Sequence, residues 1–258
     1  METIKKLSVL VLAVIMTVCF IPAMAFADDT TDTTTDTSSD TTTTTAVAQV
    51  GSTTYDTLPE AVAAATDGDT VTLLQDASGS GVSIVAANAK QITIDFDGHT
   101  YTMDGTAVGS SGYESQAMHF EKGSDITLEN GTLKVKNNAA MGVQNYADLT
   151  LDDFTIDATE NSNCSYGLSN NNGEVNIEGS SSIKVADGQY AFDVCLTNYY
   201  PDGAQVTVDT TGTIDGKVQY DLWGTLNLIR TIHRSRSKTG HSQEASLSIP
   251  DWKTKLLT

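Results

Sequence analysis

Carboxylates recur at one place in a short pattern that repeats along the chain. An aliphatic residue, Thr or Asn and a second aliphatic residue come directly before an acid, which is in turn Asp95, Glu129, Asp152, Glu178 and Asp209. If the aliphatic residues face the inside of stacked strands, side-chain alternation places these acids outside in one column. Clustered carboxylate oxygens are ligands that Ca²⁺ prefers, so a calcium site is one hypothesis, with Asp97 and Asp153 as further ligands. The alternative is that turns carry the acids outward and water screens them.

A second recurring tripeptide predicts another set of candidate residues on a different strand. The predicted outward column is His119, Gly142, Gly167, Asp193 and Asp221, and the column beside it is Glu121, Gln144, Ser169, Cys195 and Trp223. The two glycines predict a shallow groove, and two acids one strand apart lie near the ~5 Å carboxyl separation of retaining glycosidases. Trp223, and Tyr199 and Tyr200 in a turn between strands, are suited to stacking on a sugar ring. Catalysis by the acid pair, glycan binding and an ordinary solvated face all stay open.

Both sets depend on short strands that repeat along the chain. The first tripeptide starts at residues 71, 92, 126, 149, 175, 206 and 226, so the steps of 20 to 34 residues fall in the range of solenoid repeats. The second tripeptide and a weaker third one are separated from it by turns rich in Gly, Asn and Asp. Three short strands per repeat predict an all-β fold, a parallel β-helix solenoid over residues 46–228.

A short helix is predicted before the first repeat. Thr57-Leu58-Pro59-Glu60 has the spacing of a capping box, with Thr57 as the N-cap, and an alanine-rich run continues to Ala65. Terminal coils of a solenoid need a cap, so we expect this helix to cover the first coil.

The opening of the repeat region also resembles a known family. The run from Val50 to Asp76 and the segment from Ile92 to Thr100 are similar to the first coils of right-handed parallel β-helix domains in bacterial cell-surface proteins. The resemblance implies a pectin-lyase-like fold, which polysaccharide lyases, glycoside hydrolases, adhesins and structural modules share. It also implies that a lyase would use a basic residue, usually arginine, with Ca²⁺. Residues 28–228 contain no arginine and only scattered lysines, which disfavours that activity.

Charge and cysteine content limit the possible partners. Residues 28–228 hold 30 acidic residues and 6 lysines, a net charge of −24, while the whole chain has −19. Such a body repels nucleic acid, so we expect neutral or cationic partners, or anions bridged by divalent cations. Cys164 and Cys195 are predicted on opposite strand faces and therefore unbridged.

The two ends of the chain differ from the repeat region. Residues 1–27 have the lysines, the apolar run and the Ala25-Phe26-Ala27 site of a signal peptide, with no transmembrane anchor expected. Residues 28–45 are only Thr, Asp and Ser, which predicts a disordered tether. Residues 229–258 are basic and lack the repeat, so they are interpreted as a truncated or out-of-frame tail unrelated to the fold, or as a basic contact segment.

Together these features predict a secreted or cell-surface recognition module. We expect a monomer that binds a glycan or a cell-surface protein without catalysis and needs no cofactor, apart from the possible Ca²⁺. Two alternatives stay open, a polysaccharide lyase or glycoside hydrolase and a structural spacer fragment of a larger adhesin.

Overall fold

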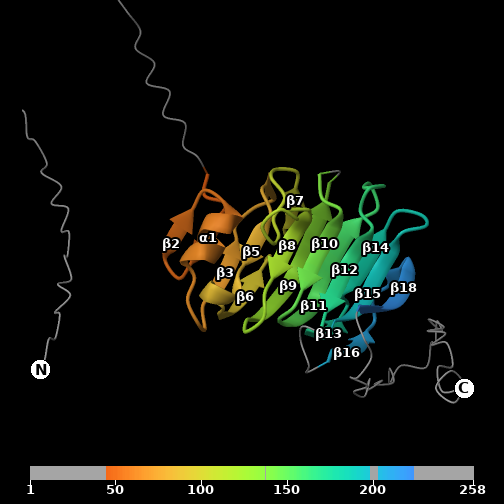
Figure 1. The fold of residues 1–258 in the computed structure, drawn as a ribbon. Helices are drawn as coiled ribbons and strands as arrows, with labels where there is room; N and C mark the ends of the chain where they lie inside the picture. The colour runs from red at the N-terminus through yellow and green to blue at the C-terminus, as the bar shows by residue number, and fades with distance from the viewer. Residues whose placement is uncertain (1–44, 137, 198–202, 224–258) are drawn as a thin grey trace, which may run out of the picture. The chain divides into compact units, whose positions relative to one another are not determined.

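The computed structural model describes residues 45–136, 138–197 and 203–223 (Figure 1). The predicted signal peptide, residues 28–44 of the tether, the tail, Tyr199 and Tyr200 lie outside these ranges, as does the side chain of Trp223. Within them, no helix is long and apolar enough to cross a membrane.

The described part is almost entirely β-structure in two sheets. Sheet A has two sets of strands, joined because two long strands belong to both. The first set is β3 (Thr70–Leu73), β6 (Gln91–Asp95), β9 (Asp125–Val135), β11 (Asp148–Ala158), β13 (Glu174–Gly179) and β16 (Gln205–Thr210). The second set consists of β4 (Ala77–Gly79), β7 (Thr100–Met103), β14 (Ser182–Val185) and β17 (Ile214–Asp215). In it, β7 pairs with the C-terminal half of β9 and with β4, and β14 pairs with the C-terminal half of β11 and with β17.

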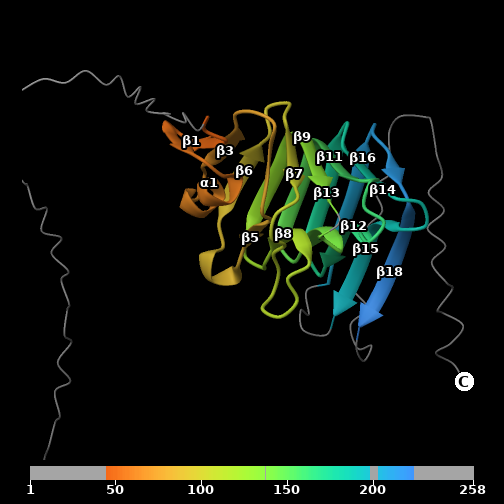
Figure 2. The same cartoon turned by 90° about the horizontal axis from the view of Figure 1, so that it is seen from above.

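Sheet B is formed by strands that alternate along the chain with those of sheet A. Its members are β5 (Val82–Ile84), β8 (Gln116–Phe120), β10 (Met141–Asn145), β12 (Tyr166–Asn171), β15 (Tyr190–Thr197) and β18 (Lys217–Trp223). Each of these strands pairs in parallel with the next one in the list. Figures 1 and 2 show the colours of the strands advancing in chain order along the stack. The arrangement is all-β and compatible with the predicted β-helix.

The sequence at the beginning of the stack forms the predicted helix. Helix α1 (Leu58–Ala64) starts after Thr57, whose Oγ1 accepts a hydrogen bond from the Glu60 backbone N–H at 3.3 Å. The Thr57 hydroxyl also donates to the Glu60 carboxylate at 2.9 Å. Lys90 caps the other end, since its Nζ donates to the carbonyl of Ala65 at 2.7 Å, where a cation favours the helix dipole. The predicted capping box is therefore confirmed.

A short hairpin before α1 was not predicted. Strands β1 (Ala48–Val50) and β2 (Thr53–Tyr55) pair antiparallel through a turn at Gly51, which has φ +58°. Strand β1 also pairs antiparallel with β3. A single 3₁₀ turn, η1 (Ala86–Asn88), follows β5. Figures 1 and 2 both place α1 and the hairpin at the same end of the stack.

Alternating apolar side chains form one core between the sheets. Its largest fully buried members include Tyr101, Phe96, Phe120, Phe154, Ile94, Met103 and Met118. Phe96 and Phe154 pack edge to face with ring centroids 4.7 Å apart. Buried area of this kind is the main favourable term for a fold with few long-range ion pairs.

The structure describes two cysteines. Cys164 belongs to the core, whereas Cys195 lies near Asp193, and both are buried free thiols, so the predicted absence of a bridge agrees with the structure.

Candidate functional site

The predicted acidic column lies on the outer side of sheet A. Asp95, Glu129, Asp152, Glu178 and Asp209 pair directly with one another on successive strands. The polar residues two positions earlier form the equivalent row, which is Thr93, Thr127, Thr150, Asn176 and Thr207. The registers of both rows were therefore predicted correctly. In the first repeat the register was wrong, because Val71 pairs with Ile94 and not with Ile92.

A second acidic row on this face was missed. It consists of Asp125, Asp148 and Glu174, with Gln91 and Gln205 at its two ends. The signal was present in the sequence, since each of these residues directly precedes the first aliphatic residue of a repeat. Burial, followed by repulsion from Glu174 and Asp125, raises the pKa of Asp148 above its usual value.

Like charges also affect the predicted column. Burial raises the pKa of Glu129, and Asp95 and Asp152 on the two neighbouring strands raise it further. Within residues 45–136, 138–197 and 203–223, no group of three or more His, Cys, Asp or Glu side chains is close enough to hold a metal ion. A Ca²⁺ site on this column stays a prediction.

The turns beside the column use some of its carboxylate oxygens. Asp95 Oδ1 accepts hydrogen bonds from the Asp97 N–H at 2.8 Å and the Asn130 amide at 3.1 Å. Asp153 Oδ1 accepts from the N–H and hydroxyl of Ser180 at 2.7 and 2.8 Å, and these bonds lower its pKa. Asp97, Asn130 and Asp153 have positive φ, a conformation in which Asn and Asp are favoured. These acids therefore serve the turns as well as the surface.

The outer row of sheet B differs from the predicted one. The observed row is Ser83, His119, Gln144, Ser169, Asp193 and Gln219. Asp193 pairs with Gln219, whereas Asp221 pairs with Cys195. The predicted column that placed Asp193 directly beside Asp221 was therefore wrong. The two acids are diagonal neighbours, positions that are typically ~7–8 Å apart between adjacent strands.

The cause is an irregular alternation in β8, β10, β12 and β15, where two successive residues, such as Gly142 and Val143, face the core. A Cβ on Gly142 would lie 3.0 Å from the core methyl Cγ2 of Ile156, and one on Gly167 would lie 2.6 Å from Ile183 Cγ2. Ala117 and Ala191 are the corresponding buried residues of neighbouring strands. The predicted outward glycine groove was therefore wrong, because this position faces the core. The irregularity shifts the alternation of every later residue by one.

Asp193 is the most unusual polar residue of this row. It is only 4% exposed, and its Oδ2 accepts a hydrogen bond from the Ser169 hydroxyl at 3.0 Å. Its Oδ1 is buried and has no hydrogen-bond partner in the structure. Burial raises the pKa of Asp193 to about 6, the Ser169 hydrogen bond opposes the rise and the charge of Asp221 adds to it. The Gln219 amide is near enough to favour the charged form, but it donates to the Tyr166 hydroxyl at 3.4 Å and makes no bond to Oδ1.

Aromatic and thiol groups surround this carboxylate. Tyr166 and Tyr190 stack with ring centroids 5.5 Å apart, and Lys217 Nζ lies 5.4 Å from the centre of the Tyr190 ring. Burial, and after it the charges of Asp193 and Asp221, raises the pKa of the Cys195 thiol to about 12. Cys195 is therefore no nucleophile at neutral pH.

The other end of the row is occupied by His119. The imidazole is fully buried, with Nδ1 3.1 Å from Gln144 Oε1 and Nε2 3.4 Å from Glu121 Oε1. Tyr146 packs edge-on against the ring at 5.8 Å. Because both ring nitrogens already have polar neighbours, His119 is a structural part of the row.

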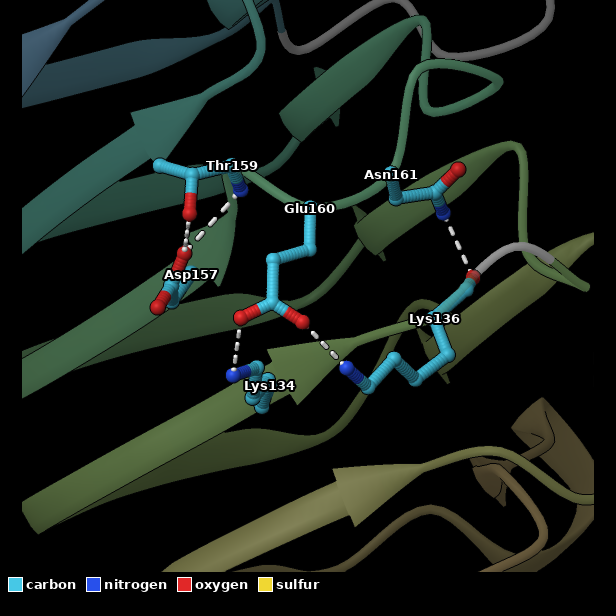
Figure 3. Close-up of polar contacts among 6 residues, drawn as sticks. All are labelled: Lys134, Lys136, Asp157, Thr159, Glu160 and Asn161. Atoms are coloured by element: carbon cyan, nitrogen blue, oxygen red, sulfur yellow. Dashed lines mark hydrogen bonds and ion pairs between the residues drawn. The ribbon is translucent and has the colours of Figure 1, made fainter.

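Two of the scattered lysines, Lys134 and Lys136, form ion pairs with one acid. Figure 3 shows the Glu160 carboxylate between Lys134 and Lys136, with Nζ–O distances of 2.6 and 2.5 Å. The two hydrogen bonds lower the pKa of Glu160 to about 2. In the same corner, buried Asn161 donates to the Lys136 carbonyl at 2.5 Å, and Asp157 accepts from the Thr159 N–H at 3.0 Å. An ammonium that is held in this way is a poor proton acceptor.

Of the predicted sugar-binding residues, the structure describes Asp193, Asp221 and the backbone of Trp223. Trp223 pairs with Thr197 on the neighbouring strand. Tyr199 and Tyr200 lie outside the described residues. Tyr166, Tyr190 and Gln219 were missed as members of this site, because the predicted register placed them in other columns. Comparison with protein-family models, curated proteins and solved structures found no match to this chain.

Proposed function

We propose that this protein is a secreted or cell-surface recognition module that binds glycans on the outer face of sheet B, without catalysis. In this proposal the two sheets are parts of a right-handed parallel β-helix of the pectin-lyase-like kind. The repeat pattern and the parallel pairing of successive strands support that fold. The leader-like residues 1–27 support export.

The observation that carries the proposal is the combination of planar polar side chains and an aromatic pair at one place. Gln144, Ser169, Asp193 and Gln219 line one row, and the stacked rings of Tyr166 and Tyr190 lie beside it. Sugars present hydroxyl groups at their edges and C–H groups on their faces. Carboxylate and amide groups suit the edges, and aromatic rings suit the faces.

Glycan retention by the purified full chain tests this function. We expect immobilised polysaccharides from a neutral and acidic panel to retain the protein, with no shortening of soluble chains. Tyr166→Ala should weaken the retention at least tenfold, because it removes half of the aromatic pair. Thr150→Ala, on the opposite sheet, is the matched control and should change nothing. Equal loss in both variants, or no retention by any glycan, would contradict the proposal.

A glycoside hydrolase is the second candidate, because one specific observation favours it. Burial gives Asp193 a pKa of about 6, as a general acid near neutral pH requires, and Asp221 is a second carboxylate. The separation of the two carboxyl groups, ~5 Å in retaining and ~6.5–9.5 Å in inverting enzymes, would decide the stereochemical outcome of such a reaction. If the same panel gives shortened products, and Asp193→Asn no longer produces them, the function is hydrolysis and not binding alone.

A further inference from the structure

The buried carboxylate of Asp193 lacks one of the hydrogen bonds that such a group needs. Oδ2 has the Ser169 hydroxyl, while Oδ1 is shielded from water and accepts nothing. Leaving a buried charged oxygen unsatisfied costs more free energy than leaving a neutral one. The Gln219 amide is near but forms no hydrogen bond to Oδ1, so a bound ligand can supply the missing donor.

The charge around Asp193 indicates what kind of donor is missing. Asp221 is close enough to raise the pKa of Asp193, and no ion pair involves Asp193 within the described part of the chain. A hydroxyl group would donate one hydrogen bond but would leave the repulsion between the two acids. A cation with N–H groups supplies both the bond and the neutralisation.

Aromatic rings favour an ammonium group over a metal ion. Tyr190 already has the ammonium of Lys217 over its ring, which shows that this pair attracts cations. Ca²⁺ takes six to eight oxygen ligands, whereas no metal-binding group of three acidic, His or Cys side chains exists in the described residues.

We infer that the Asp193 site binds the ammonium group of an amino sugar, such as a glucosamine unit with a free amine. The inference rests on the proposed glycan-binding function and names its ligand class. The amine donates to Asp193 Oδ1, the charge of Asp221 assists, and the sugar ring packs on the Tyr166 and Tyr190 side.

Entry of the amine requires a small displacement of one side chain. Gln219 lies directly opposite Asp193 and is held to Tyr166 by one long hydrogen bond of 3.4 Å. Such a bond is weak, so the amide can move aside and then donate to a hydroxyl of the sugar.

Calorimetric titration of the full chain with defined oligosaccharides tests the inference. The probes are a glucosamine tetramer, the fully N-acetylated tetramer and a tetralysine peptide of the same charge as the first. We expect the glucosamine tetramer to bind at least tenfold more tightly than either of the others. Asp193→Asn should remove this tenfold preference and leave the acetylated tetramer within twofold of its original affinity.

A matched variant distinguishes binding at the Asp193 site from nonspecific attraction of a cationic ligand to an acidic protein. Asp152→Asn removes one charge from the outer face of sheet A and should leave glucosamine affinity within twofold. Asp221→Asn, which keeps Asp193, should weaken glucosamine binding severalfold, and circular dichroism melts verify that each variant is folded. Equal effects of Asp152→Asn and Asp193→Asn would overturn the inference.

The remaining outcomes distinguish this inference from the proposed function. Equal affinity for both tetramers would overturn the amine assignment and leave glycan binding intact. Tetralysine binding as tight as glucosamine binding would show that the ammonium alone is recognised, which overturns the sugar assignment. No binding of any oligosaccharide here or in the retention panel would remove the proposed function itself.

Discussion

Asp193 shows how much a single buried carboxylate depends on register. Side-chain alternation was enough to place Asp95, Glu129 and Asp152 in one row, because the strands of that face are regular. The same reasoning failed at Asp193, because an irregularity that has no signature in a single repeat shifts the alternation. The residue itself was recognised as a candidate, but its neighbours Gln219 and Tyr166 were not.

Replacement of Asp193 by asparagine should change how stability depends on pH. The pKa of Asp193 is raised from 3.8 to about 6 in the folded protein, so between pH 4 and 6 the folded state holds a proton that the unfolded state has released. The free energy of unfolding of the original protein therefore falls as the pH rises from 4 to 6. Relative to it, Asp193→Asn should gain about 1–2 kcal/mol from pH 4 to pH 7.

Urea denaturation at pH 4, 5, 6 and 7 measures this difference. Exposed Asp56 supplies the control variant Asp56→Asn, which removes one acid from the surface without touching the Asp193 site. A constant difference for Asp193→Asn would mean that its pKa is not raised.

Glu160 is expected to titrate far below the ordinary range of glutamates. Hydrogen bonds from Lys134 and Lys136 lower its pKa to about 2, so it should stay charged in NMR titrations down to about pH 3. Replacing both lysines by methionine should return the pKa to near 4.5. Because the group is exposed, 0.5 M NaCl should weaken the shift, and a titration that is insensitive to both changes would contradict the ion-pair geometry.

At the scale of elements, local signals were the most reliable ones. The spacing of Thr57 and Glu60 predicted the start of α1, since N-cap contacts involve only neighbours in sequence, and the alanine-rich run predicted its end to within a residue. The hairpin of β1 and β2 was missed, because strands of three residues carry too little pattern to recognise. The small residues at 117, 142, 167 and 191 were visible, but whether they face inward depends on the other sheet.

A methyl group at one of these small positions should disturb the contact between the sheets. In Gly167→Ala the new Cβ would lie 2.6 Å from Ile183 Cγ2 and 2.8 Å from the Ala191 carbonyl oxygen. Overpacking of this kind typically costs about 1–3 kcal/mol, which urea denaturation can detect. Exposed Ser83 of the same sheet is the control, and Ser83→Ala should stay within ~0.5 kcal/mol. Equal stability of the two variants would refute the inward assignment.

A buried asparagine pair links strands β10 and β12 of sheet B. Asn145 Nδ2 donates to Asn170 Oδ1 at 3.0 Å and to the Ala147 carbonyl at 2.8 Å. Both asparagines are fully buried, and Asn170 donates in turn to the Gly173 carbonyl at 2.8 Å.

Asn145→Ala should be strongly destabilising. It leaves Asn170 Oδ1 and the Ala147 N–H without their present partner, and each such buried group costs about 1–3 kcal/mol. We expect a loss of about 2–4 kcal/mol in urea denaturation. Asn163→Ala, at an exposed position of a neighbouring turn, should cost far less, and comparable losses would argue against the buried pair.

At the scale of the whole molecule, the dominant property is uncompensated negative charge. Two rows of acids on sheet A raise one another's pKa values at Glu129 and Asp148, and residues 28–228 carry a net charge of −24. The charge was evident from composition alone. Of the two rows that concentrate this charge, only the one that follows each repeat tripeptide was predicted. The row of acids that precedes the tripeptides was missed, because those positions were not compared between repeats.

The melting temperature should therefore rise with salt. Raising NaCl from 20 to 500 mM screens the repulsion between exposed acids, so differential scanning calorimetry should show an increase. At equal ionic strength, CaCl₂ and MgCl₂ should stabilise to the same extent. A rise specific to Ca²⁺ would instead assign a calcium ion to the acidic column.

The parallel pairing of each strand with its counterpart one repeat later has a consequence for biosynthesis. The hydrogen bonds from Asn145 to Asn170 and from Ser180 to Asp153 join residues only 25 and 27 positions apart. A growing chain therefore needs little more than one additional repeat before the strands of the previous repeat can form their backbone hydrogen bonds. With the hairpin of β1 and β2 and then α1 synthesised before the repeats, the described strands can add to the stack in the order in which the ribosome makes them.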